Sequence, residues 1–292
     1  MSQSSFGNKF KVTTWGESHG KALGAVIDGC PAGLPLCEED IQKFLDRRKP
    51  GQSRYTTARK EGDLVEILSG VFEGKTTGTP ISLMVRNTDQ RSRDYGNIAY
   101  SYRPGHADYT FDQKYGFRDY RGGGRSSGRE TIGRVAAGAI ASKILGELGI
   151  SICTYTRSIG PVEIASFNKE EIHQNAFYMP DAQAAVKAGE YLEECMKNQD
   201  SAGGVIECRI TGTPAGLGEP VFDKLSALLA HALMSIGAVK AVEIGDGIAV
   251  TSSNGSTDND GFTVKDGEII KTSNHAGGIM GGISDGSEII LR

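Results

Sequence analysis

The spacing of apolar and polar residues predicts four helices. In the longest, Ile132, Ala136 and Ile140 recur on one stripe, and Gly149 follows directly after it. Another begins with acidic residues and ends before Pro50, as helix termini commonly do. The predicted helices are Glu38–Lys49, Gly128–Leu148, Pro180–Lys197 and Val221–Ile236.

Short runs rich in Val, Ile and Leu alternate with these helices and predict strands. The chain therefore combines helices and strands throughout its length. The predicted strands are Leu23–Ile27, Leu64–Leu68, Ile81–Val85, Val205–Ile210, Val242–Ile244 and Glu288–Leu291.

One sequence pattern occurs twice. GCPAGLP at Gly29–Pro35 and GTPAGLG at Gly212–Gly218 each follow a strand-like run and precede a predicted helix. Each helix then leads to a VEI run, at Val65–Ile67 or at Val242–Ile244. Although glycine-rich turns can recur by chance, the shared order of elements predicts two similar β-α-β halves.

A further echo links SHGKALGAVIDG, at Ser18–Gly29, to NHAGGIMGGISDG, which ends at Gly286. No low-complexity linker separates the two halves. We therefore expect one domain that spans residues 1–292.

Charge is distributed unevenly along the chain. The net charge of −4 gives no general attraction for nucleic acid, yet thirteen of the sixteen arginines lie between Arg47 and Arg134. They could form a solvated basic surface. Because they alternate with glycine, serine and tyrosine, and because a guanidinium binds carboxylate or phosphate in a bidentate manner, they favour a small anionic ligand.

The five cysteines are an odd number and form no C-x-x-C pair, which favours reduced thiols over a disulfide framework or a zinc site. The N-terminal residues have no apolar signal core, and no segment approaches the ~20 apolar residues needed to cross a bilayer. We expect a cytoplasmic protein with no bound metal and no membrane partner.

RGGGRSSGRET, at Arg121–Thr131, leads into the longest predicted helix. Its glycines allow close approach of a ligand, Ser126 or Ser127 can cap the helix, and Arg125 and Arg129 add positive charge. The spacing fits neither a P-loop nor a Rossmann turn. A phosphate or flavin-phosphate site is favoured, and a capped helix with surface arginines is the alternative.

Two of the five histidines have suggestive surroundings. His19 lies in the turn-like segment WGESHG, and His106 lies in RPGHAD, close to Arg103. A histidine near arginines and a bound anion can donate a proton to a leaving phosphate. The other three, His173, His231 and His275, are interpreted as structural.

Several long strings resemble those of chorismate synthases, in the same order and over nearly the whole chain. They are GESHG, GCPAGLP, DRRKPGQSR at Asp46–Arg54, RPGHADYT, RGGGRSSGRET and SNHAGGIMGGISDG at Ser273–Gly286. The resemblance implies an α+β fold, a β-α-β sandwich of two similar halves, assembled as a homotetramer.

The resemblance also implies a reaction. Chorismate synthases are lyases that convert 5-enolpyruvylshikimate 3-phosphate to chorismate and phosphate by a 1,4-anti elimination. The reaction requires reduced FMN, and NADP is associated with the family. It is the last common step of aromatic amino-acid biosynthesis in the shikimate pathway.

Roles carry over by position from the same resemblance. His19 matches the histidine that protonates the reduced flavin, and His106 matches the one that acts on the departing phosphate. The positions that match substrate-binding arginines are Arg48, Arg54 and Arg129. Those that match flavin contacts are Arg125, Ser126, Ser127, Gly237, Ala238 and Gly281.

This sequence departs from the family pattern in two ways. Gly128, Gly237 and Ala241 replace residues more usual in the family, which looks tolerable. Family members also continue beyond the counterpart of Arg292 with K-P-T-x-S and R-H-D-P-C segments, so we expect a chain without its C-terminal segment. An FMN-dependent lyase is the leading hypothesis. The alternatives are a truncated, non-catalytic remnant that binds the substrate or oligomerises and, disfavoured by its missing lysine motif, a P-loop nucleotide-binding protein.

Overall fold

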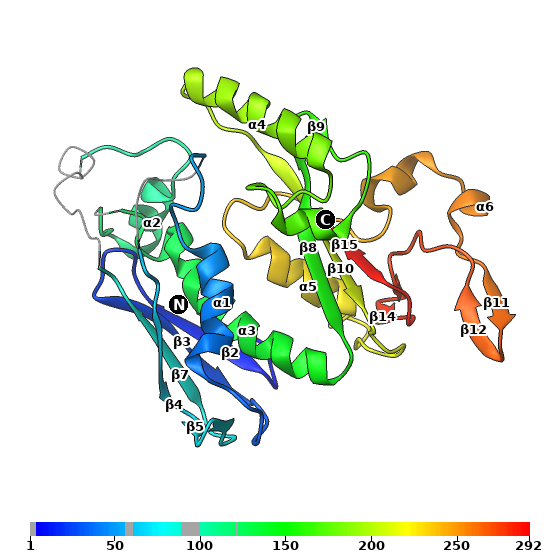
Figure 1. The fold of residues 1–292 in the computed structure, drawn as a ribbon, viewed down its shortest axis with the longest axis horizontal. Helices are drawn as coiled ribbons and strands as arrows, with labels where there is room; N and C mark the ends of the chain where they lie inside the picture. The colour runs from blue at the N-terminus through cyan, green and yellow to red at the C-terminus, as the bar shows by residue number, and fades with distance from the viewer. Residues whose placement is uncertain (1–3, 56–60, 89–99, 121) are drawn as a thin grey trace. The chain divides into compact units, whose positions relative to one another are not determined.

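The computed structural model describes residues 4–55, 61–88, 100–120 and 122–292 (Figure 1). The chain divides into two compact units, Met1–Ile144 and Leu145–Arg292, with the boundary inside a long helix. Each unit is described by itself below. The expectation of a single domain stays a prediction.

Unit 1 contains a five-stranded antiparallel sheet in the order β1-β2-β3-β7-β4. Leu23, Ala25 and Ile27 alternate along β3, and their partners on β7 are equally buried. One face of the sheet is therefore apolar. The strands are β1 (Ser5–Phe6), β2 (Lys11–Gly16), β3 (Ala22–Asp28), β4 (Val65–Ser69) and β7 (Ile81–Arg86), and a small hairpin pairs β5 (Val71–Phe72) with β6 (Lys75–Thr76).

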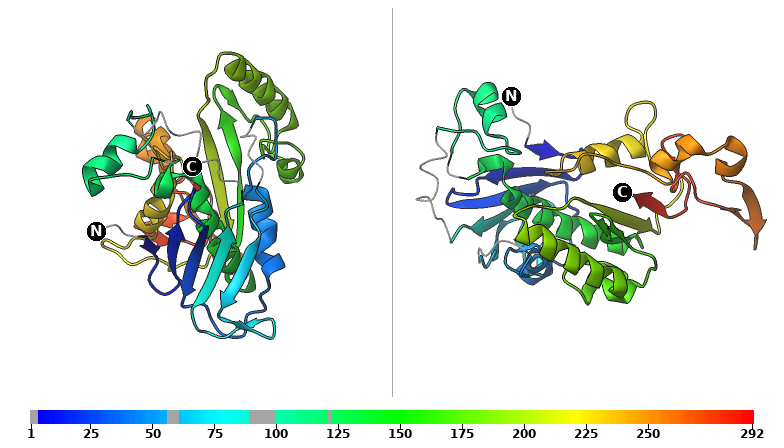
Figure 2. Two further views of the ribbon diagram at one scale, coloured as in Figure 1. Left: turned by 90° about the vertical axis from the view of Figure 1, so that its left-hand side faces the viewer. Right: turned by 90° about the horizontal axis from the view of Figure 1, so that it is seen from above.

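Two helices cover this apolar face: α1 (Glu38–Arg48) and α3 (Thr131–Glu147) (Figures 1 and 2). Ile41 of α1 and Ile132 of α3 belong to the same buried cluster as the sheet residues. A shorter helix, α2 (Asp108–Tyr115), ends at Gly116 in a left-handed conformation. The arginine-rich segment before α3 forms two 3₁₀ turns, η2 (Gly124–Ser126) and η3 (Gly128–Glu130).

Unit 2 contains a four-stranded antiparallel sheet in the order β15-β10-β8-β9. Cys208 and Ile210 of β10 join the cluster around α5, whereas Glu207 and Arg209 alternate to the other face. Figure 2 shows α4 and α5 on opposite sides of this sheet. The strands are β8 (Ser151–Ile159), β9 (Val162–Glu163), β10 (Gly204–Thr211) and β15 (Ile289–Leu291), and the long helices are α4 (Ala182–Lys197) and α5 (Leu225–Met234).

The remaining elements of unit 2 are short. Two hairpins pair β11 (Phe262–Lys265) with β12 (Glu268–Lys271) and β13 (Ile279–Met280) with β14 (Ile283–Ser284). The other short pieces are η4 (Lys169–His173), η5 (Gly247–Ser252) and α6 (Gly255–Asp258).

The repeated P-A-G-L turn has the same hydrogen bonds in both units. In unit 1, Thr76 Oγ1 accepts from the amide of Leu34 at 3.0 Å and donates to the carbonyl of Pro31 at 2.6 Å. In unit 2, Ser284 Oγ accepts from the amide of Leu217 at 2.8 Å and donates to the carbonyl of Pro214 at 2.6 Å. Two sequence copies therefore fold into one local structure.

The glycine that opens each turn is required by close backbone packing. Gly29 has φ +80° and Gly212 has φ +79°. A Cβ atom would lie 1.7 Å from the carbonyl oxygen of Lys9 in the first case and 2.1 Å from that of Gly149 in the second. Both carbonyls precede the neighbouring antiparallel strand by two residues, so the two turns pack alike.

The hairpins that carry these hydroxyls also correspond. Val71 pairs with Thr76 in unit 1 and Ile279 pairs with Ser284 in unit 2, and each hairpin leads directly into a sheet strand, β7 or β15. The structure thus confirms the repeated P-A-G-L order. The similarity between Ser18–Gly29 and Asn274–Gly286 does not correspond to a repeated structure, so this prediction is wrong. The first segment contains strand β3, whereas the second contains the β13–β14 hairpin.

The second VEI run is not a strand as predicted. Ile67 of β4 pairs with Leu83, and the corresponding Ile244 pairs with Leu291 only as an isolated bridge. Hydrogen bonds in both directions between Glu243 and Arg292 extend this contact. The other edge of β15 (Ile289–Leu291) pairs with β10 over three residues, so the regular ladder lies on that side.

Two predicted helices begin later than expected. The first turn of Gly128–Leu148 is 3₁₀, so α3 starts at Thr131. The prediction Val221–Ile236 fails at its start because Glu219 and Asp223 form a bridge, which leaves Phe222 exposed in the turn between them. Glu38–Lys49 and Pro180–Lys197 match α1 and α4 closely. Several elements were not predicted: β1, β2, β8, β9, α2 and the hairpin strands.

Candidate active site

Two of the predicted substrate-binding arginines share one buried carboxylate. Arg48, the last residue of α1, donates from Nη1 to Oδ2 of Asp63 at 2.7 Å. Arg129, on η3, donates from Nη2 to Oδ1 of the same residue at 3.1 Å. The Asp63 side chain is fully buried, so the two guanidiniums are held in a fixed relation inside unit 1.

Asp63 has an unusual backbone for an aspartate, with φ +45°. A non-glycine residue in the left-handed region is strained, and such strain is often found at functional sites. Asp63 follows Glu61 by two residues, and Glu61 Oε1 lies 3.7 Å from Nη1 of Arg129. Two carboxylates thus face two arginines at this site.

One guanidinium nitrogen of this cluster has no hydrogen-bond acceptor among the described residues. Arg129 is buried, yet its Nη1 has no hydrogen-bond partner among the described residues. A buried donor without a partner is costly, and a ligand with an anionic oxygen would satisfy it. The pKa of Arg48 is lowered, chiefly by burial, although the attraction of Asp63 opposes this effect.

The turn that carries His19 is connected to the same cluster. Gly20 N donates to the carbonyl of Glu17 at 3.1 Å, which closes a turn around His19. Asn87, just after β7, donates from Nδ2 to the carbonyls of Glu17 and Gly20 and accepts at Oδ1 from Arg129. His19 and Arg129 are therefore linked through one amide.

The imidazole of His19 is buried and closely packed. Its Nδ1 lies 3.1 Å from Ser18 Oγ. Gly122, with φ +89°, packs against the ring, and a Cβ atom there would lie 2.3 Å from its Cε1. Any side chain at position 122 would therefore occupy the space that the ring of His19 fills.

The second predicted catalytic histidine lies in a loop that is tied to Gly122. His106 is exposed, its amide donates to the carbonyl of Arg103, and its Nδ1 is 3.1 Å from the carbonyl of Pro104. Arg103 pairs with the buried Asp108 at 2.8 Å and also donates to the carbonyl of Gly122 at 3.1 Å. This arginine connects the His106 loop to the residue that packs on His19.

The Arg103–Asp108 pair is itself stable to titration. The hydrogen bond from Arg103 is the largest influence on Asp108, and it holds the pKa of that carboxyl well below its usual range against the effect of burial. Asp108 is therefore held as a carboxylate paired with Arg103 in the RPGHAD loop.

The predicted flavin-binding residues of unit 1 lie just before α3. Arg125 donates from Nη1 to the carbonyl of Gly16 and from Nη2 to Thr14, so it holds strand β2. Ser126 Oγ donates to the carbonyl of Gly123 at 2.6 Å. The side chain of Ser127 caps η3, as expected for this segment, by accepting from the amide of Arg129 at 3.3 Å.

The third predicted substrate arginine, Arg54, lies in the turn that follows α1. Its side chain is exposed, its guanidinium lies 4.9 Å from the ring centroid of Tyr55, and its Nη2 donates to the Tyr55 hydroxyl. Arg54 is therefore positioned by an aromatic neighbour, in contrast to the buried pair Arg48 and Arg129.

The other predicted flavin contacts lie in unit 2. Gly237 and Ala238 form the turn after α5, where Ala238 has φ +68°. Gly281 lies at the tip of the β13–β14 hairpin with φ +61°, and a Cβ atom there would meet nothing within 4 Å. In both segments, main-chain atoms are accessible to a ligand.

Sequence reasoning missed the residues that position the site. Asp63, Glu61, Asn87 and Gly122 were not singled out. A weak signal existed for the two carboxylates, which alternate directly before a predicted strand within the arginine-rich region. No local pattern marks Asn87, because its partners are 42 to 70 residues away.

The histidines interpreted as structural lie in unit 2. His173 ends η4 and His231 lies on an exposed face of α5. His275 Nδ1 is 2.7 Å from Asp246 Oδ2, and this hydrogen bond raises the pKa of the histidine. With Asp258, these two side chains offer ligand atoms within 4.8 Å of one another and could hold a cation.

The five cysteines are free, as predicted: Cys30, Cys37, Cys153, Cys195 and Cys208. Among the residues that the structure describes, no helix is both long enough and apolar enough to cross a membrane.

Comparison with known proteins gives one consistent result. A family model described as chorismate synthase matches residues 10–292. The chorismate synthase of Agathobacter rectalis is 66% identical over 294 residues, and that of Chloroflexus aggregans is 56% identical over 293. The alignments cover all of this chain and 80% of each relative.

A solved structure gives the same result. A chain titled "Crystal Structure of Chorismate Synthase" superposes with a TM-score of 0.83 at 35% identity, covering 97% of this chain and 82% of its own. The α+β fold predicted from the sequence is thereby confirmed. The chain belongs to the chorismate synthase family, whose members are lyases.

Proposed function

We propose that this chain carries out the elimination of phosphate from 5-enolpyruvylshikimate 3-phosphate, in the cytoplasm and with reduced FMN. The observation that carries the proposal is the buried cluster of Arg48, Asp63 and Arg129, in which one guanidinium nitrogen has no hydrogen-bond partner among the described residues. A small ligand with several anionic groups supplies the acceptors that this cluster lacks.

The two histidines have distinct surroundings in this proposal. His106 is exposed in a loop fixed by Arg103 and Asp108, so its ring can reach a departing phosphate and donate a proton to it. His19 is buried against Gly122, with Nδ1 held by Ser18. A buried imidazole that is held in one orientation can transfer a proton to a bound cofactor at a fixed position.

The predicted flavin-binding residues fit a planar cofactor that approaches the backbone closely. A Cβ atom at Gly124, Gly128 or Gly281 would meet nothing within 4 Å, so these positions are open to a ligand. Ser126 and Ser127 in unit 1, and Gly237 and Ala238 in unit 2, are the other flavin contacts that the resemblance proposes. When bound, FMN supplies the temporary electron transfer that weakens the bond to phosphate. The substrate loses phosphate and a C–H hydrogen, so the overall reaction has no net redox change.

Assembly as a homotetramer is part of the proposal. The β11–β12 hairpin carries Phe262, Val264 and Ile269, which are all exposed, and alternation places them on one face. An isolated two-stranded hairpin with an apolar face gains stability when that face is covered.

The proposal is tested by mixing the protein with reduced FMN and 5-enolpyruvylshikimate 3-phosphate without oxygen. We expect equal amounts of chorismate and phosphate, and no chorismate when the flavin is left oxidised. Arg129→Ala is expected to lower kcat/KM by about 10²-fold or more, because a charged contact to the substrate is lost. Substrate binding without formation of either product would contradict the proposal.

A further inference from the structure

Asn87 connects the two parts of unit 1 that the proposed reaction uses. Its Nδ2 donates to the carbonyl of Glu17 at 3.0 Å and to that of Gly20 at 2.8 Å. These are the first and last residues of the turn that contains His19. Its Oδ1 accepts from Nε of Arg129 at 3.1 Å and from Nη2 at 2.8 Å.

The orientation of this amide follows from its partners. An arginine has only donors, so the oxygen must face Arg129, and a backbone carbonyl has only acceptors, so the nitrogen must face Glu17 and Gly20. Both donors and two acceptor positions of Asn87 are thus in use. The main-chain amide of Asn87 also donates to the carbonyl of Lys21 at 3.1 Å, which fixes the residue against the start of β3.

No other side chain available at this position reproduces these contacts. Aspartate keeps the acceptor for Arg129 but places a negative oxygen against two carbonyls. Leucine has a similar size but supplies neither donor nor acceptor. The contacts therefore require a short side chain that donates on one side and accepts on the other.

We propose that Asn87 is a positioning residue, which aligns the turn of His19 with the guanidinium of Arg129. The inference rests on the proposed function, in which Arg129 binds the substrate and His19 protonates the reduced flavin. The side-chain amide of Asn87 is fully engaged by protein groups. It keeps the His19 turn and the Arg129 side chain in a fixed relative position while a ligand binds.

The decisive variant is Asn87→Asp, because it keeps the contact with Arg129 and loses only the two bonds to the turn. We expect kcat to fall by about 10- to 100-fold, since small misplacements of reacting groups have effects of this size. KM is expected to change by less than about threefold, because Arg129 stays in place. The matched control is Asn198→Asp, the same substitution at the exposed C-cap of α4, which should leave both constants unchanged.

A second readout does not depend on catalysis. With histidine side chains labelled by ¹³C, the His19 signal should shift in Asn87→Asp while those of His173, His231 and His275 stay unchanged. In the unaltered protein, the side-chain amide protons of Asn87 should exchange slowly with solvent. This measurement applies even if the variant folds poorly.

These measurements distinguish failure of the proposed function from failure of the positioning role of Asn87. If the unaltered protein forms no chorismate, the proposed function fails, whereas the His19 shift and the slow amide exchange still support the alignment of the turn by Asn87. An unmoved His19 signal, or rapid exchange of the Asn87 amide, would overturn the inference. A rise in KM with unchanged kcat would also overturn it, because Asn87 would then act through Arg129 alone.

Discussion

Each unit contains a fully buried carboxylate surrounded by arginines, and the two clusters differ in one respect. In unit 1, Asp63 holds Arg48 and Arg129, and Nη1 of Arg129 lacks a hydrogen-bond partner among the described residues. In unit 2, Glu207 accepts from three arginines and from the hydroxyl of Tyr155.

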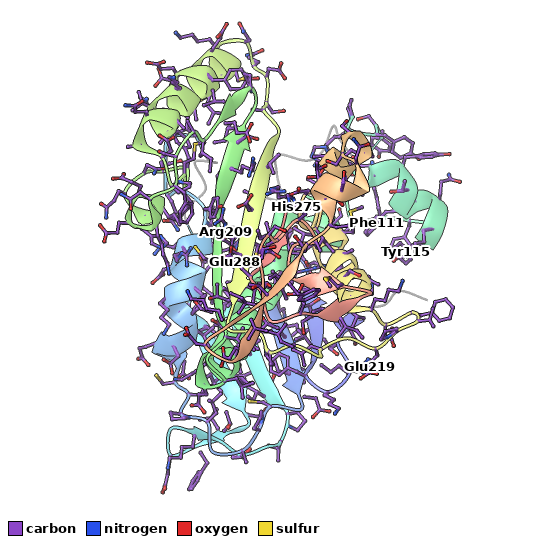
Figure 3. The ribbon with its side chains drawn as sticks, turned by 90° about the vertical axis from the view of Figure 1, so that its right-hand side faces the viewer. Phe111, Tyr115, Arg209, Glu219, His275 and Glu288 are labelled. Carbon is purple, nitrogen blue, oxygen red and sulfur yellow. The ribbon has the colours of Figure 1, made fainter. Side chains whose placement is uncertain are left out.

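The arginines of unit 2 have further partners or reach solvent. Arg157 also bonds to Glu163, Arg292 donates to the carbonyl of Gly245, and Arg209, whose side chain is 33% exposed, lies 3.7 Å from Glu288 just before β15 (Figure 3). An arginine cluster is therefore not by itself evidence of an anion site. The donor that the protein leaves unsatisfied separates a binding cluster from a structural one.

The largest expected effect is in the saturated cluster. Glu207→Gln removes the charge that three arginines share, and breaking such a buried arrangement is expected to cost about 3–5 kcal/mol of unfolding free energy. Urea denaturation measures this loss. Glu163→Gln, at an exposed partner of the same cluster, is the control and should cost about 1 kcal/mol or less. Equal losses would show that Glu207 does not organise the cluster.

In unit 1 the corresponding substitution should respond to ligand. Asp63→Asn is expected to cost about 1.5–3 kcal/mol, because hydrogen bonds to a charged group are lost while Glu61 remains. Inorganic phosphate should then raise the melting temperature of Asp63→Asn more than that of the unaltered protein, since an anion can replace the lost carboxylate. Phosphate should have a smaller effect on Glu207→Gln, because each of the three arginines keeps another contact, with Glu163, Gly245 or Glu288. An equal response of both variants would remove the distinction between the clusters.

The repeated turn gives a smaller, paired prediction. Thr76→Val and Ser284→Ala each leave a backbone amide without its hydroxyl partner, at the buried Leu34 and at the part-buried bond of Leu217 respectively. Each substitution is expected to cost about 1–2 kcal/mol in chemical denaturation. Similar losses would support equivalence of the two turns. If only one substitution destabilises the protein, the shared geometry does not reflect shared energetics.

The smallest effect is expected from the partly exposed pair of His275 and Asp246. The hydrogen bond to Asp246 raises the pKa of His275 above its ordinary value of 6.5. The pair therefore stabilises the folded protein below 6.5, and this contribution is lost as the pH rises through the folded-state pKa. Comparing unfolding free energies on both sides of this range, with Asp246→Asn as control, measures it. A pH dependence unchanged in the variant would count against the pair.

The sequence by itself determined the elements whose signals are local. The acidic start of α1, its end before Pro50 and the glycines of the repeated turn all act over a few residues. For the same reason Arg48, Arg129 and His19 could be singled out, since long motifs carry them. The free cysteines and the two similar halves also follow from patterns within the chain.

Only the tertiary structure decided which of these residues meet. Asp63 joins Arg48 to Arg129 across 15 and 66 residues, and Asn87 joins Arg129 to the His19 turn across 42 and up to 70. Whether a buried arginine nitrogen finds a hydrogen-bond acceptor among the described residues, as around Glu207, or does not, as at Nη1 of Arg129, depends on neighbours from distant parts of the chain. Such partners are set by sheet register and helix packing, and a linear pattern does not contain them.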